Sequence, residues 1–294
     1  MSMAQVEIRP ITKVSETDQL EDVQRETWRM PDIEVLPSRF LHAMQFNGSP
    51  LIGAFVGERV VGYVFGTLGT VQGLEARIDQ IAAARLQLYS VMMGVLPDYQ
   101  GLGIGYRLKL AQREFALRVG VRLVTWTFDP LESRNGYFNI AKLGVVCHRY
   151  LRDFHGRMGG INRGLPTDRL HAEWWVTNNR VEARVVRNRG SLNLHAFVGG
   201  GARLVNDVTI GSHGLPTPQP PFEQSNSRII MVEIPADIQA IKQANMDLAQ
   251  SWRAHTREIF EHYFERGYVV TDFVRHQEDD GRQRSLYVLT HMEA

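Results

Sequence analysis

The chain has 294 residues, of which 44% are hydrophobic and 22% charged, and its formal net charge is +1 at pH 7. This length allows one large domain or two modest ones, and the near-zero charge argues against nucleic acid or an anionic membrane as partners. The single cysteine, Cys147, excludes an internal disulfide. The start of the chain, MSMAQVEIRP, has no apolar signal segment, and no uncharged stretch reaches the ~20 residues of a membrane span. We expect a cytoplasmic protein.

Strand-like and helix-like segments alternate from the beginning of the chain. Residues 6–11 predict a short strand, and residues 51–56 and 59–67 are β-rich runs joined at Gly57-Glu58, which indicates a hairpin. Residues 85–95, RLQLYSVMMGV, are apolar at successive positions, as a central strand buried on both faces should be. The first hundred residues therefore predict a sheet with covering helices.

Three glycines alternate with larger residues in PDYQGLGIGYRLKLAQREFA, residues 97–116. A helical stripe follows at Leu108, Ala111, Phe115 and Val119, and Gly120 suits the end of that helix. Residues 121–128 predict a further strand and residues 135–143 a short helix. In the strand HAEWWV, Trp174 and Trp175 are expected on opposite faces. The alternation predicts an α/β protein with a mixed α+β sheet.

A proline-rich segment, residues 214–227, predicts a stiff, extended connector. Beyond it we expect a strand, one long helix from Ile238 to Tyr263 that ends at Gly267, and two more strands. This order repeats that of the glycine region, but ADIQAIKQ stands where the first copy has the glycines. Both an internal duplication and a chance match between α/β segments explain the repetition.

Four explanations compete for the glycines. The spacing is not G-x-G-x-x-G, which argues against a dinucleotide site, and Tyr106-Arg107 follow Gly105 where a Walker loop has Lys and Ser/Thr. A tight strand-to-helix turn without a ligand is the third explanation. The fourth is a pyrophosphate cradle, because the first amides of a helix lack intrahelical partners and the helix dipole favours an anion there.

Gln100-Gly101-Leu102-Gly103-Ile104-Gly105 resembles the Q/R-x-x-G-x-G/A loop of the GNAT N-acetyltransferase superfamily. The approach VMMGVLPDYQG and the later KLGV resemble neighbouring segments of that family, so that the likeness covers about residues 6–177. It implies the GNAT acyl-CoA N-acyltransferase fold in a domain of residues 1–178. A linker region, residues 179–228, and a GNAT-like half-domain without the cofactor loop, residues 229–294, would follow.

The resemblance also implies acetyl-CoA as co-substrate and direct transfer of its acetyl group to a small-molecule or peptide amine, without a metal. By position, Met93 and Val95 would contact the pantetheine arm and Asn135 would lie beside it. The pyrophosphate would bind to the loop residues Gln100, Gly101, Leu102, Gly103, Ile104 and Gly105. We expect a monomer or homodimer, and an acceptor pocket shaped by residues 69–85 and 130–134.

The sequence offers several candidates for the catalytic acid and base. Where many family members have a tyrosine, four residues before the glycine of KLG, this chain has Ile140. Tyr137, one helical turn earlier, is a candidate to replace this acid, although we favour a role in the core for this tyrosine. Ser90 or its neighbour Tyr89 should face the reaction point, and Asp129 is a candidate base or merely the start of a turn.

The sequence is also compatible with functions other than acyl transfer. Because of Ile140, a non-catalytic CoA-binding or regulatory module on the same scaffold is the alternative to an enzyme, and a nucleotide-binding module is the third candidate. Cys147, in an apolar strand, is expected in the core rather than as an acyl carrier. The ten histidines show no metal-site spacing.

Overall fold

The computed structural model describes residues 6–71, 86–211 and 214–291. The chain divides into two compact units, which we describe separately: residues 1–126 with 159–161, and residues 127–158 with 162–294. Most of the predicted acceptor segment 69–85 lies outside the described residues. Within the described part of the chain, no helix is long and apolar enough to cross a membrane.

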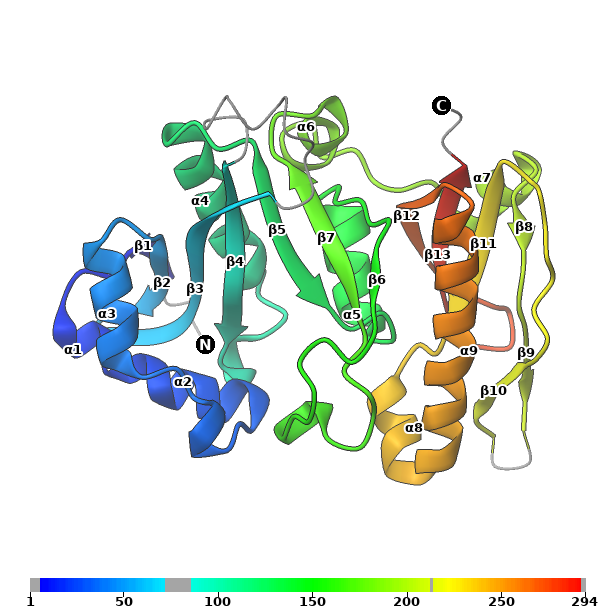
Figure 1. Cartoon of the computed structure of the whole chain (residues 1–294), viewed down its shortest axis with the longest axis horizontal. Helices are drawn as coiled ribbons and strands as arrows, with labels where there is room; N and C mark the ends of the chain where they lie inside the picture. Colours follow the sequence, from blue (N-terminus) through cyan, green and yellow to red (C-terminus); the bar gives the residue numbers. More distant parts are fainter. Residues whose placement is uncertain (1–5, 72–85, 212–213, 292–294) are drawn as a thin grey trace. The chain divides into compact units, whose positions relative to one another are not determined.

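The first unit is built on a mixed sheet with the strand order β1-β2-β3-β4-β5 (Figure 1). Strands β1 to β4 pair antiparallel with their neighbours, whereas β4 and β5 are parallel. The predicted hairpin turns at Gly57, whose φ of 60° suits glycine. The strands are β1 (Glu7–Pro10), β2 (Leu51–Val56), β3 (Arg59–Thr70), β4 (Leu86–Val95) and β5 (Leu123–Phe128).

Among the described residues, this sheet is covered by the helices α1 (Val14–Thr17), α2 (Gln19–Trp28), α3 (Ser38–Phe46) and α4 (Ile104–Arg118). Figure 1 shows α4 behind β4. The predicted apolar stripe of α4 was only partly right, because Val119 is 44% exposed and the buried side chains include Lys109 and Gln112. Helix α4 thus buries two polar side chains, Lys109 and Gln112, against the sheet.

The second unit begins with α5 (Ser133–Gly136) and a π-helical turn, η4 (Tyr137–Lys142), over most of the predicted helix. Strand β7 (Arg169–Trp175) pairs antiparallel with β6 (Tyr150–Leu151). Trp174 is fully buried and donates its indole N–H to the Leu143 carbonyl, whereas Trp175 is 44% exposed. The prediction of opposite faces for the two tryptophans is confirmed. Two short helices follow, α6 (Asn179–Val185) and α7 (Leu194–Gly199).

The C-terminal part of this unit contains a four-stranded sheet with the order β12-β13-β11-β8 and a two-stranded sheet of β9 and β10. The strands are β8 (Arg203–Leu204), β9 (Asp207–Ile210), β10 (Pro216–Gln219), β11 (Ile229–Ile234), β12 (Tyr268–Gln277) and β13 (Gln283–His291). The predicted order of strand, helix, strand and strand is confirmed at the level of secondary structure. Within the proline-rich segment, Pro216–Gln219 form strand β10, which pairs with β9, and the Pro216 carbonyl accepts a hydrogen bond from the Trp252 indole.

The prediction of one long helix in this region was wrong. The segment divides into α8 (Ile238–Ala244) and α9 (Met246–Glu265) at Asn245, whose backbone is extended. The Asn245 side chain accepts a hydrogen bond from the Leu248 amide and so caps the second helix. Asparagine competes for backbone groups in this way, which periodicity of apolar residues does not reveal.

Candidate functional site

Strands β4 and β5 of the first unit separate soon after they meet. Their parallel pairing consists of Leu88 with Val124 and Tyr89 with Thr125. From Ser90 onward, the edge of β4 that faces β5 has no strand partner within the described part of the chain. Met93 and Val95, the predicted pantetheine contacts, lie on this unpaired stretch. Unpaired backbone groups at such an edge are available to an extended ligand.

A β-bulge changes the facing of the side chains along β4. Opposite β3, Phe65 pairs with Met92 and Gly66 with Ser90, so that Val91 is the extra residue. On one side of the bulge, the Ser90 hydroxyl points to α4, and on the other side Met93 Cε lies near Gly105, at the start of the same helix. The bulge therefore turns Ser90 and Met93, three residues apart, to the same face.

The glycine loop that follows β4 is open. After the 3₁₀ turn Pro97–Tyr99, Gly101 and Gly103 have φ angles of 82° and 75°, which other residues rarely adopt. A Cβ atom added to either glycine would meet no atom of the described residues within 4 Å. Gln100 braces the loop, because its side-chain amide donates to the Val95 carbonyl at 3.0 Å. The loop thus presents bare backbone to open space at the N-terminus of α4.

Gly105 differs from the other two glycines. Its φ is not positive, and an added Cβ would lie 3.7 Å from Met93 Cε, which is an ordinary contact. The chain itself therefore does not require glycine at this position. That a side chain here would obstruct a ligand remains a prediction, as do the ligand contacts of Leu102 and Ile104.

Two buried polar residues that the sequence analysis missed lie near the point at which β4 and β5 separate. Lys109 on α4 is 2% exposed and donates to Ser90 Oγ at 2.8 Å and to Gln112 Oε1 at 3.0 Å. Burial lowers the pKa of Lys109 well below its usual range. The Ser90 hydroxyl, a predicted catalytic group, is therefore engaged by a buried amine.

The remaining predicted site residues belong to the second unit. Asp129 Oδ2 accepts a hydrogen bond from Arg253 Nη2 at 2.5 Å, and Oδ1 accepts one from the Leu131 amide at 2.8 Å. Burial alone would lower the pKa of the Arg253 guanidinium. The charge and hydrogen bond of Asp129 have the larger effect, so that the pKa lies above its usual value. Both Asp129 oxygens are thus engaged in hydrogen bonds, and one of them pairs with a buried cation.

Asn135 is exposed, and Tyr137 lies at the start of the π-helical turn with the Arg275 guanidinium 4.8 Å from its ring centroid. Ile140, at the family's tyrosine position, is fully buried. This position therefore contributes to the core of the second unit and supplies no proton. Tyr137 keeps a partly exposed phenol and stays the candidate acid.

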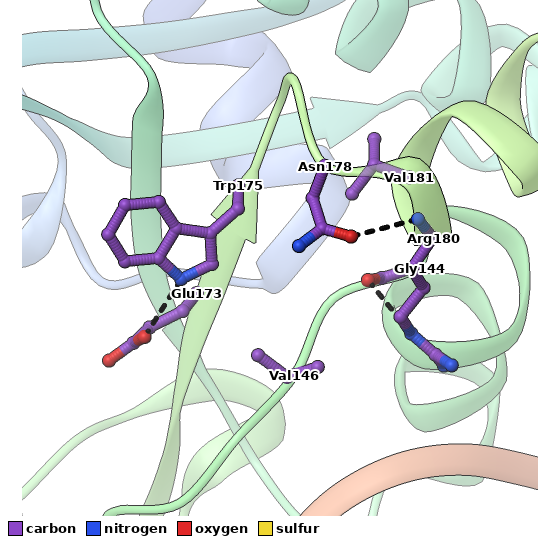
Figure 2. Close-up of a pocket in the computed structure, with 7 residues that line it drawn as sticks. All are labelled: Gly144, Val146, Glu173, Trp175, Asn178, Arg180 and Val181. Carbon is purple, nitrogen blue, oxygen red and sulfur yellow. Dashed lines mark hydrogen bonds between the residues drawn. The ribbon is translucent and has the colours of Figure 1, made fainter.

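A small pocket of the second unit lies beside Trp175 (Figure 2). The Trp175 indole donates to Glu173 Oε2 at 3.2 Å, and Arg180 on the other side donates to the Gly144 carbonyl. Burial alone would raise the pKa of Glu173, but His171 and His148 hold it below its usual value. The pocket has a volume of ≈ 40 Å³, which is room for about one water molecule and not for an acceptor substrate.

The single cysteine of the chain lies in the second unit. Cys147 is fully buried, and burial together with the nearby Glu173 raises the pKa of its thiol well above the usual value. A thiol that keeps its proton is a poor nucleophile, in line with the expected place in the core. Among the described residues, no group of three or more His, Cys, Asp or Glu could hold a metal ion.

The described residues of the first unit form an open amide loop at a helix N-terminus and, leading to it, a strand edge to which none of them pairs. These features would suit an elongated ligand with an anionic group at one end. Residues 17–138 match the model of the acetyltransferase (GNAT) family, which confirms the resemblance predicted from the glycine loop. The mixed α/β fold predicted from the sequence is confirmed.

Solved structures of acetyltransferases resemble the chain at low sequence identity. NAA60 of Arabidopsis thaliana in complex with acetyl-CoA is 18% identical with a TM-score of 0.45, over 58% of this chain and 99% of that one. The ribosomal-protein-S18-alanine N-acetyltransferase of Escherichia coli is 10% identical, with a TM-score of 0.44 over 59% and 96% of the two chains. An N-acetyltransferase from Staphylococcus aureus Mu50 is 14% identical, with a TM-score of 0.42 over 59% and 99%. No curated protein matches the sequence significantly.

Proposed function

We propose that the protein transfers an acetyl group from acetyl-CoA directly to the nitrogen of an amine acceptor. The observation that carries this proposal is the open loop of Gln100–Gly105, in which neither Gly101 nor Gly103 has an atom of the described residues within 4 Å on its Cβ side. Hydrogen bonds to a charged group contribute about 1.5–3 kcal/mol each, so a few loop amides suffice to hold a diphosphate. The match of residues 17–138 to the family model supports the same ligand.

The strand edge suits the rest of the coenzyme. The pantetheine arm carries amide groups that can pair, as a further strand would, with the backbone of β4 at Met93 and with the amide N–H of Val95, whose carbonyl already accepts from Gln100. By the family resemblance, Asn135 lies beside the same arm. We retain residues 1–178 as the catalytic part and residues 229–294 as a half-domain without a cofactor loop.

The reaction needs an acceptor nitrogen with a free electron pair. A lysine-like amine with a pKa near 10.4 costs about 4–5 kcal/mol to deprotonate at pH 7. Its nitrogen then forms the C–N bond at the thioester carbonyl, the C–S bond breaks, and the CoA thiolate leaves and takes up a proton. We assign the supply of that proton to Tyr137, because Ile140 has none to give. Asp129 is the less suitable base, since it pairs with Arg253.

A non-catalytic CoA-binding module is the second candidate, and the burial of Ile140 at the usual tyrosine position favours it. One pair of measurements separates the two functions. Calorimetric titration of the full chain with acetyl-CoA should show binding, and a panel of amines of graded basicity should release CoA thiol over time. Binding without release with any amine would support the module, and no binding at millimolar acetyl-CoA would refute both candidates.

A further inference from the structure

Lys109 occupies the point at which β4 and β5 separate. The last paired residues are Tyr89 and Thr125, so that Ser90 and Trp126 are the first residues beyond the paired stretch. The Lys109 amine bridges these two: its Nζ lies 2.8 Å from Ser90 Oγ and 3.7 Å from the centroid of the Trp126 ring. One side chain of α4 therefore connects both strands at the apex of their separation.

The contacts of this amine satisfy it without a counter-ion. An ammonium has three donors and no acceptor, and Lys109 is surrounded by Ser90 Oγ, Gln112 Oε1 and the electron-rich face of Trp126. None of the ion pairs of the described residues includes it. Gln112 Nε2 is itself buried without a partner. Burying an amine in this way disfavours its charge, so the hydrogen bonds of Lys109 make at most a small net contribution to the stability of the fold. Fold stability therefore does not explain Lys109.

The place of Lys109 along the proposed acyl-CoA site offers an explanation. Helix α4 begins at the glycine loop, and Lys109 follows Gly105 by little more than one turn of the same helix. Along β4, Ser90 and Val95 are separated by about 17 Å at the usual rise of a strand. A ligand whose diphosphate lies on the loop and whose arm follows β4 has its far end, the thioester, near the apex.

We propose that Lys109 is a positioning residue of the acyl transfer. By holding Ser90 and Trp126 together, it fixes the width of the gap between β4 and β5 at the thioester end and so places the reacting carbonyl. This inference rests on the proposed function. It differs from a structural role, because the amine contributes to the rate of transfer while a methyl-terminated side chain would maintain the fold equally well.

The test compares Lys109→Met with the wild-type chain. Methionine keeps the length of the stem and removes the donors. We expect kcat with the best amine of the panel to fall about tenfold, the calorimetric Kd for acetyl-CoA to stay within about twofold, and the melting temperature not to fall. Arg118→Met is the matched control, since Arg118 is an exposed cation of the same helix, and it should leave all three quantities unchanged.

A Lys109→Met variant with wild-type kcat would overturn the inference while the proposed function stands, and so would parallel losses of stability and kcat. Should that variant not fold, Ser90→Ala serves as the test, because it removes only the hydroxyl that accepts from Nζ. The inference then requires reduced kcat at unchanged Kd, and an unchanged kcat refutes it. A wild-type chain that fails to bind acetyl-CoA would refute the proposed function itself.

Discussion

The two ends of helix α4 allow a controlled test of the glycine loop. Gly103 precedes the helix with a φ of 75°, and Gly120 follows it with a φ of 77°. Among the described residues, neither glycine has an atom within 4 Å on its Cβ side. Alanine therefore introduces the same backbone strain at both positions, with no clash at either. The 15 residues of α4 separate the two ends by about 22 Å.

We expect Gly103→Ala and Gly120→Ala to destabilise the fold equally, by roughly 1–2 kcal/mol, because an L-residue in the left-handed region costs about that much. Their effects on acetyl-CoA should differ. At Gly103 the new methyl group occupies the open side of the loop, where the diphosphate is proposed to bind. Loss of one hydrogen bond to a charged group, about 1.5–3 kcal/mol, weakens binding roughly tenfold to a hundredfold.

Thermal unfolding and calorimetric titration with acetyl-CoA measure the two quantities on the same samples. Gly120→Ala should bind acetyl-CoA with the affinity of the wild type. Equal affinity in all three proteins would show that the loop amides do not hold the ligand. An equal loss of affinity in both variants would attribute the effect to general destabilisation instead.

Three further predictions concern single side chains. Asp129→Asn leaves the buried Arg253 without its carboxylate and should cost about 3–5 kcal/mol of stability by denaturant unfolding; a native-like midpoint with a lowered kcat would instead make Asp129 a catalytic group. Hydrogen bonding from Arg9 lowers the pKa of Glu16 to about 2, below the 4.5 of an unfolded chain, so the contribution of Glu16 is complete above about pH 4.5 and is lost as the pH falls toward 2. It amounts to about 3 kcal/mol, and Glu16→Gln should show a shallower loss of stability across that window in acid titrations. Tyr137→Phe should lower kcat about a hundredfold at unchanged melting temperature if the phenol protonates the thiolate, and an unchanged kcat would remove Tyr137 from the mechanism.

The glycine loop could be predicted from the sequence because its causes are local. A glycine at a left-handed position, a preceding strand and a following helical pattern all lie within about twenty residues, and backbone geometry alone links them. The hairpin at Gly57 and the helix end at Gly120 were predictable for the same reason. Where a backbone conformation favours a single residue type, as a positive φ favours glycine, the sequence indicates that conformation directly.

The Lys109 cluster was not predictable in this way. Its partners come from β4, from α4 and from β5, and each of them looks unremarkable in its own segment. Hydrophobic periodicity assigns a lysine to the solvent side of a helix, and only the partner groups that accept its protons permit burial. The bulge at Val91 was hidden as well, because the apolar run of β4 does not record which residue lacks a partner on β3.

Asp129 shows why predictions of catalytic residues were weaker than those of the loop. In the sequence it stands before Pro130, where a turn and a general base are both reasonable readings. Its partner Arg253 is 124 residues away, and it is this distant cation that engages the carboxylate. The chemistry of an acid or base depends on charges and burial that long-range folding supplies, whereas an amide loop needs only its own backbone. The ligand-binding part of the site is therefore the part that sequence can anticipate, and the proton-transfer part has to be found by substitution.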